Sequence, residues 1–326
     1  MVENLELQCI KQASVSNTGP VLFSIIKNED YFLPFFFNHY RRIGISNFLI
    51  YDDHSDEPTL DFLHAQADCT IVGSQARFGD DFGVDNFGVQ RRLASFLKEI
   101  LPDTLLSGRW VLTADADEFL ILPSGLADLA QLIGSLERMG QPYLTAPMVD
   151  FYGETLDHRN YRRDLSPFLG NPYFDVGPYY FWKDRISPYR LGGGVRFKLL
   201  RMLCAKHPDE IAAIYGDHAP APAAVWKAPL LKHGAGVTRI SDHELSVAPQ
   251  SEVTAALAHF KFYPGLDAKI DDALKVAQYY NRSMEYAFLK AATQLMGGES
   301  LITWETRRFE GPSSLERSGL LRGPGG

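Results

Sequence analysis

Three carboxylates follow a short apolar run near the middle of the chain, at Asp115, Asp117 and Glu118. The preceding segment, Trp110–Leu112, is typical of a buried strand in a parallel sheet. Side chains two residues apart in an extended chain lie on one face, about 7 Å apart, so Asp115 and Asp117 can flank one ligand. Paired carboxylates suit a hard divalent cation, which would neutralise a diphosphate. The motif therefore predicts nucleotide-sugar chemistry at the carboxyl end of a strand, where open α/β sheets bind their ligands.

A second acidic cluster follows another apolar run, Phe48–Tyr51. It contains Asp52, Asp53, Ser55 and Asp56. At the carboxyl end of a strand these carboxylates could accept hydrogen bonds from a base or a ribose. The alternative interpretation is a turn rich in aspartate, whose side chains bind their own backbone.

Two histidine segments lie late in the chain, around His243 and around His259 with the nearby Lys261. A single histidine is more often a structural hydrogen-bonding group than a metal ligand. The residues by themselves leave open which histidine, if either, binds a metal.

The elements that would position these side chains alternate between strand and helix in the first half of the chain, which predicts βαβ units and a mostly parallel sheet. We expect Asp30 to cap the first helix and Pro102 to close the helix over Asn86–Leu101. The segment Asp150–Pro222 is irregular and rich in Tyr, Pro, Gly and Arg, which is typical of a binding surface or lid. The predicted strands are 21–26, 48–51, 70–72, 110–112 and 143–149, and the later predicted helices are 126–139, 267–280 and 283–295.

The composition of the 326 residues is that of a soluble globular protein, with 45% hydrophobic and 22% charged residues. No apolar stretch approaches the roughly 20 residues of a membrane span, and the polar segment Met1–Lys11 does not resemble a secretory signal, so we expect a cytoplasmic protein. Three distant cysteines fit neither a disulfide framework nor a zinc site. The net charge of −8 argues against a nucleic-acid partner. The basic residues Arg159, Arg162 and Arg163 leave peripheral membrane association, at the inner face, open.

Three blocks resemble the inverting family 2 glycosyltransferases, specifically the bacterial branch related to family 92. These blocks are Lys27–Asp56, Asp115–Phe119 and the pair of histidine segments. The resemblance implies a glycosyltransferase A-type, Rossmann-like fold: one mostly parallel sheet flanked by helices, with an irregular insertion and C-terminal helices. The catalytic domain would span residues 1–266, with a nucleotide half at about 20–122 and an acceptor half at about 123–266. Residues 267–326 would form a helical extension packed on it.

By the same resemblance, the chain would transfer a sugar from a nucleoside-diphosphate sugar, with a UDP-sugar as the default, to a saccharide or glycolipid acceptor. Asp52 or Asp53 would hold the base, Asp115 the ribose, and Asp117 an Mn²⁺ or Mg²⁺ ion on the diphosphate. Lys261 would face the phosphate oxygens. The implied nucleotide-binding set is Asn28, Glu29, Asp52, Asp53, Ser55, Asp115 and Lys261, and the implied metal ligands are Asp115, Asp117, His243 and His259.

Inverting transfer also needs a carboxylate that activates the acceptor hydroxyl. The candidates are Asp150 and Glu154 after a predicted strand, and Asp242 and Glu244 beside His243. The glycine run Gly192–Gly194 lacks the spacing of a phosphate loop. We expect it to form a turned or flexible segment that borders the acceptor site, where Arg196 could meet an anionic group.

Two other functions compete with glycosyl transfer. An aspartate-nucleophile phosphatase or phosphotransferase also carries Asp-x-Asp after an apolar strand, but normally on its first strand. A carbohydrate-binding protein could keep the same fold without turnover.

Overall fold

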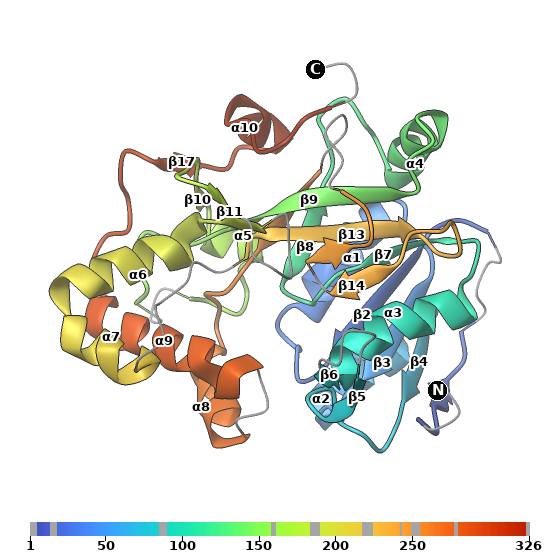
Figure 1. Ribbon diagram of the computed structural model, residues 1–326, viewed down its shortest axis with the longest axis horizontal. Coiled ribbons are helices and arrows are strands. Elements are labelled where there is room, and N and C mark those ends of the chain that lie inside the picture. Colours follow the sequence, from blue (N-terminus) through green and yellow to red (C-terminus); the bar gives the residue numbers. More distant parts are fainter. Residues whose placement is uncertain are drawn as a thin grey trace. The chain divides into compact units, whose positions relative to one another are not determined.

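The computed structural model describes residues 5–13, 18–84, 90–157, 161–182, 190–216, 224–241, 243–248, 255–276 and 280–323. Its centre is a nine-stranded mixed sheet flanked by helices, which confirms the predicted α/β class (Figure 1). In spatial order the strands are β1 (Gln8–Lys11), β4 (Cys69–Gly73), β3 (Phe48–Asp52), β2 (Val21–Ile26), β7 (Trp110–Thr113), β13 (Trp226–Lys232), β9 (Tyr143–Asp150), β16 (Ala256–His259) and β8 (Glu118–Ile121).

Parallel pairing dominates the part of the sheet built from the first half of the chain. Strand β2 runs parallel to both β3 and β7, with Leu22 opposite Phe48 on one side and Leu112 on the other. Strand β3 is also parallel to β4. The outer strand β1 and the strand β13 are antiparallel to their neighbours β4 and β7. Because β2, β3 and β7 point the same way, the loops that follow them open at one edge of the sheet.

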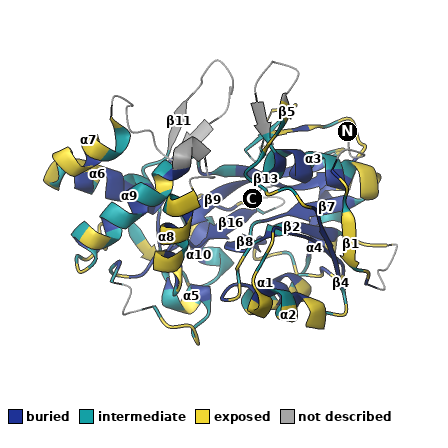
Figure 2. Cartoon of the chain, turned by 90° about the horizontal axis from the view of Figure 1, so that it is seen from below, coloured by how far each residue is buried: buried dark blue, intermediate teal, exposed yellow. Residues whose placement is uncertain are grey.

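Helices cover both faces of these parallel strands. Figure 2 shows helix α3 (Leu93–Leu105) on one side of β2 and β7, and helices α1 (Leu33–Arg42) and α2 (Glu57–Ala65) on the other. Alternate strand residues serve the two faces, as the two-residue period of a strand requires. Phe23 and Tyr51 pack in one buried cluster with Leu97 of α3, whereas Phe48 stacks on Phe37 of α1 with ring centroids 4.2 Å apart.

The chain divides into two compact units. The first contains Met1–Ala146, Lys227–Leu257 and Leu321–Gly326, and the second contains Pro147–Trp226 and Ala258–Leu320. None of the described helices is both long enough and apolar enough to cross a bilayer.

The remaining elements are β5 (Asp81–Val84), β6 (Gln90–Arg92), α4 (Leu129–Arg138), β14 (Arg239–Ser241), β15 (Glu244–Leu245), α5 (Pro167–Gly170), β10 (Tyr173–Asp175), β11 (Tyr180–Trp182), β12 (Arg190–Gly192), α6 (Gly194–Lys206), α7 (Pro208–Tyr215), α8 (Leu266–Val276), α9 (Tyr280–Met296), β17 (Thr306–Arg308) and α10 (Pro312–Arg317).

Three sequence predictions about these elements were wrong in detail. Helix α1 has Phe32 rather than Asp30 at its N-cap, without a side-chain cap. Helix α3 begins at Leu93 because Gln90–Arg92 pairs as a strand, and it continues past Pro102 to Leu105. A proline removes only one backbone donor, and the burial of Leu97 and Leu101 against the sheet offsets that loss.

The third error concerns the irregular segment, whose described residues include the short helix α5 and the longer helices α6 and α7. The sequence pattern does not predict helix α6, because the helix begins with glycine and buries Arg196 and Lys198 as well as Leu199 and Leu203. Charged residues on a buried face break the amphipathic period that predicts a helix.

Candidate functional site

The loops after β2 and β3 are held together at the carboxyl edge of the first unit. Asn28 donates its backbone N–H to Ser55 Oγ (3.3 Å), and its own side-chain oxygen accepts the Asp56 N–H (2.8 Å). Asn28 and His54 both adopt left-handed backbone conformations, with φ of +53° and +60°. Such conformations cost free energy in non-glycine residues and concentrate at functional sites. The structure thus brings the predicted nucleotide-binding residues Asn28 and Ser55 into contact.

Asp52 and Asp53, at the end of β3, are buried in different ways. The Asp52 carboxylate accepts the backbone N–H of Ser55, three residues further on, at 3.3 Å, which is the kind of local contact that the alternative interpretation, an aspartate-rich turn, requires. Asp53 is fully buried; its Oδ1 accepts the Phe78 N–H at 2.7 Å, and its Oδ2 has no partner among the described atoms. Burial raises the pKa of Asp53. An unpaired buried oxygen costs free energy until a ligand or water binds it.

Asp115 lies between two lysines. Its Oδ1 accepts a hydrogen bond from Lys98 of α3 and its Oδ2 one from Lys227 of β13, both at 2.9 Å. Lys227 also bridges to Glu118 Oε1 at 2.5 Å, and Glu118 Oε2 accepts the Asp115 N–H at 3.1 Å. Burial alone would raise the pKa of Asp115, but the two ammonium groups hold that pKa well below its ordinary value. Asp115 is therefore a carboxylate whose charge is already balanced.

A small cavity of about 10 Å³ adjoins this cluster, with Thr113, Asp115 and Arg239 in its lining. This volume suffices for about one water molecule. The two lysines were missed by the sequence analysis because they lie 17 and 112 residues from Asp115. No local spacing links them to the motif.

A metal ion could be held by Asp117, Glu118 and His259. Each offers one ligand atom, and these atoms lie within 4.8 Å of one another. All three side chains are buried. Two of the predicted ligands, Asp117 and His259, belong to this group, and Glu118 from the same motif joins them. Asp115 and His243 do not belong to it.

Asp150, the last residue of β9, is the buried centre of a charged network in the second unit. Its Oδ1 is 2.6 Å from Nδ1 of His259, and its Oδ2 accepts a hydrogen bond from Nε of Arg196 at 3.1 Å. Nη1 of Arg196 also donates to Glu285 at 2.7 Å. The anionic groups that meet Arg196 are thus two carboxylates of this chain.

The glycine run positions Asp150 at the start of helix α6. Gly194 has a φ of +73°, and a Cβ on it would lie 2.8 Å from Asp150 Oδ2. A Cβ on Gly193 would lie 2.6 Å from a ring carbon of Tyr179. Only residues without a side chain allow this close approach. The glycine run is therefore explained by packing around a carboxylate.

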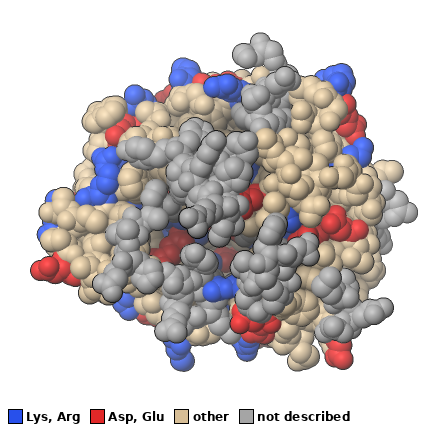
Figure 3. All heavy atoms as spheres, in the orientation of Figure 1, with Lys and Arg blue, Asp and Glu red and all other residues tan. Residues whose placement is uncertain are grey.

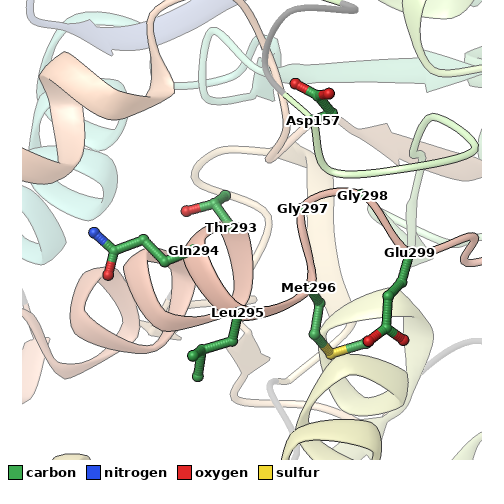
Figure 4. A pocket seen from close by; sticks show the side chains of 8 residues that line it. All are labelled: Asp157, Thr293, Gln294, Leu295, Met296, Gly297, Gly298 and Glu299. Carbon is green, nitrogen blue, oxygen red and sulfur yellow. The ribbon is translucent and has the colours of Figure 1, made fainter.

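The other predicted site residues are less closely tied to these clusters. Glu154 is exposed, in the loop after β9, and Glu29, His243, Glu244 and Lys261 are half-buried. Asp242 and Arg159 lie outside the described residues. A depression of about 480 Å³ lies at the C-terminal end of α9 (Figure 4), and none of the predicted site residues is in its described lining.

Acidic and basic side chains are interspersed among the described residues on the face shown in Figure 3. The chain matches no protein-family model and no curated protein sequence. The resemblance to family 2 glycosyltransferases, and the partners it implies, therefore stay predictions.

Proposed function

We propose that this protein is a metal-dependent glycosyltransferase of the A-type fold. It would transfer a sugar, with inversion, from a nucleoside-diphosphate sugar to a saccharide or glycolipid. The default donor is a UDP-sugar, as the sequence resemblance implies.

The observation that carries this proposal is the common edge formed by the loops after β2, β3 and β7. Because β2 is parallel to both neighbours, Asn28, Asp53 and Asp115 all follow strands that end at the same side of the sheet. Ligands of open α/β sheets bind outside the carboxyl ends of such strands. The unpartnered Oδ2 of Asp53 supports base binding there, since a pyrimidine ring such as uracil offers an N–H donor to a carboxylate.

The donor set of Asp117, Glu118 and His259 supports a divalent cation. Two carboxylates and one imidazole suit Mn²⁺, whereas Mg²⁺ prefers oxygen ligands and retained water. When bound, the ion would act as a Lewis acid on the leaving diphosphate. Within the protein, Lys98 and Lys227 neutralise Asp115, so that this motif does not gather three uncompensated charges.

The acceptor hydroxyl needs a carboxylate with an available lone pair and a suitable pKa. Asp150 is a weak base, because Arg196 and His259 bind both of its oxygens and its pKa lies below the ordinary value. Glu154 is exposed in the next loop. We therefore favour Glu154 over Asp150 as the general base.

The phosphatase alternative requires an aspartate oxygen that can attack phosphorus. Both Asp115 oxygens accept hydrogen bonds from lysines, which supports glycosyl transfer over that alternative. Incubation with UDP-sugars and Mn²⁺, and separately with small phosphoesters, separates the two: the proposal expects slow UDP release from the first and no phosphate release from the second.

The test of binding is a thermal-shift screen of nucleoside diphosphates with and without Mn²⁺. We expect UDP to raise the melting temperature only when Mn²⁺ is present, because a ligand that binds the folded state stabilises it. Asp117→Ala should abolish that shift, whereas the control Asp61→Ala, at an exposed position of α2, should retain it. The absence of a shift with every nucleoside diphosphate, with or without metal, would contradict the proposal.

A further inference from the structure

Asp150 uses its two carboxylate oxygens for two different side chains. Oδ1 pairs with Nδ1 of His259 and Oδ2 with Nε of Arg196. The three side chains are 1–8% exposed, so water does not compete for these atoms. The arrangement fixes the orientation of each group.

The charge state of Asp150 decides where the histidine proton lies. Oδ2 of Asp150 forms an ion pair with Nε of the Arg196 guanidinium at 3.1 Å, so the group is an ionised carboxylate. An ionised carboxylate can only accept hydrogen bonds. Nδ1 of His259 must therefore carry the proton in this contact, and the lone pair of the neutral ring lies on Nε2.

Arg196 in turn determines which way Asp150 faces. A guanidinium can only donate, and Nη1 of Arg196 is anchored on Glu285. Gly194 gives Asp150 room, because a Cβ there would lie 2.8 Å from Oδ2. The carboxylate is thus held from one side so that its other oxygen faces His259.

We propose that Asp150 and Arg196 are positioning residues that hold His259 in the Nδ1-protonated tautomer, which makes Nε2 its metal-binding atom. The metal part of this inference rests on the proposed function. Metal-binding histidines commonly donate their other ring N–H to a carboxylate, and loss of that partner weakens metal binding by roughly 10–100-fold.

The substitution Asp150→Asn should reverse the tautomer of His259. Asparagine has one oxygen, and Arg196 can only donate to it, so the amide N–H₂ must face Nδ1 of His259. Nδ1 then has to accept, and the proton moves to Nε2. The additional substitution Arg196→Met removes this constraint, so the amide can rotate and the Nδ1-protonated tautomer returns.

The experiment is ¹⁵N NMR of metal-free protein labelled in histidine, at about pH 8, above the ordinary histidine pKa of about 6.5. His259→Gln assigns the His259 signals among the nine histidines. We expect protonated Nδ1 in wild type, protonated Nε2 in Asp150→Asn, and protonated Nδ1 in Asp150→Asn/Arg196→Met. The control Glu285→Gln, which leaves both Asp150 contacts in place, should match wild type.

A wild-type spectrum with protonated Nε2 overturns the inference, and so does an unchanged tautomer in folded Asp150→Asn. If that variant fails to fold, the wild-type spectrum alone decides the tautomer.

Titration with Mn²⁺, followed by electron paramagnetic resonance of the free ion, tests the metal part. We expect Asp150→Asn to bind Mn²⁺ about 10–100-fold more weakly than wild type, and the double variant to recover part of that loss. Equal binding by wild type and a tautomer-reversed Asp150→Asn overturns the role of Nε2 while the proposed function stands. No binding by wild type overturns the metal part and the metal dependence of the proposed function together, whereas the tautomer result is unaffected.

Discussion

Asp115 and Asp150 are both carboxylates whose two oxygens are taken by cationic or imidazole partners, yet the two regions are built differently. Asp115 is 37% exposed, meets two lysines from α3 and β13, and adjoins a cavity the size of one water molecule. Asp150 is 1% exposed and meets the planar groups of Arg196 and His259. A lysine ammonium is a point charge on a flexible stem, whereas a guanidinium fixes direction. The first region can adjust its contacts around a ligand, and the second holds one geometry.

The largest change in stability is expected from removing the Lys227 ammonium group, which pairs with both Asp115 and Glu118 in the first region. Lys227→Met leaves the buried Glu118 without its cation, because Lys227 joins Glu118 and Asp115. Breaking a buried ion pair in this way costs about 3–5 kcal/mol of unfolding free energy, measured by urea denaturation. The control is Lys232→Met on the same strand, whose pair with Glu137 is exposed and should change stability by less than about 1 kcal/mol. Equal losses in both variants would mean that the cluster around Asp115 does not stabilise the fold.

The pH dependence of stability should distinguish His39, which belongs to the first unit but to neither of the two regions, from Glu285 of the second region. His39 of α1 pairs through Nε2 with the Leu120 carbonyl of β8 at 2.8 Å, and burial lowers its pKa to about 4. The unfolded chain binds this proton below about pH 6.5. Above about pH 6.5, His39 therefore does not lower the free energy of unfolding. As the pH drops to about 4, proton binding by His39 in the unfolded chain lowers that free energy by about 3 kcal/mol. His39→Gln should reduce the dependence of the unfolding free energy on pH between about pH 6.5 and pH 4, measured by urea denaturation at each pH.

Glu285 of the second region should not contribute to the pH dependence of stability over the same range. Burial alone would raise the pKa of Glu285, but Arg196 holds it below the ordinary value. The stabilisation of the folded state by ionised Glu285 is therefore lost only as the pH falls below about 4. Glu285→Gln should leave the slope between about pH 6.5 and pH 4 as it is in wild type, and a flattened slope would contradict the assignment to His39.

A smaller effect should come from the glycine that makes room for Asp150. Gly194→Ala and Gly216→Ala both place a side chain at positive φ, but only the first meets an atom within 4 Å. The difference between the two variants therefore isolates the displacement of Asp150. We expect Gly194→Ala to lose about 1–3 kcal/mol more than Gly216→Ala in thermal denaturation. Equal losses would show that Asp150 can move freely and that the second region does not hold one geometry.

The smallest change in stability is expected at Asp53. Burial raises its pKa, so its ionised form disfavours folding at neutral pH, and Asp53→Asn should stabilise the protein slightly at pH 7. Below about pH 4 the two proteins should converge in stability. If Oδ2 binds the base, the same substitution should weaken UDP binding by at least about tenfold, measured by calorimetry. Unchanged UDP affinity would remove Asp53 from the nucleotide site.

The regular parts of the first unit could be predicted because their residues follow local rules. Val21–Ile26, Phe48–Tyr51 and Trp110–Leu112 are apolar runs of strand length, and the structure has β2, β3 and β7 there. In the second unit, α8 and α9 lie where helices were predicted, but α6 and α7 were not predicted. Helix α6 carries buried charges, whose partners Asp150 and Asp175 are 46 and 23 residues away from Arg196 and Lys198.

The sequence by itself determined the α/β class and the acidic motif with Asp117 at a strand end, because strand patterns and carboxylate spacing are local properties, but it left open which of His243 and His259 could join Asp117 in a metal group. Only the tertiary structure decided that Glu118 joins that group, that two lysines neutralise Asp115, and that Asp150 binds Arg196 and His259. These contacts join residues from 17 to 112 positions apart, or from separate strands and helices, and the charge balance of a buried site depends on which of them meet.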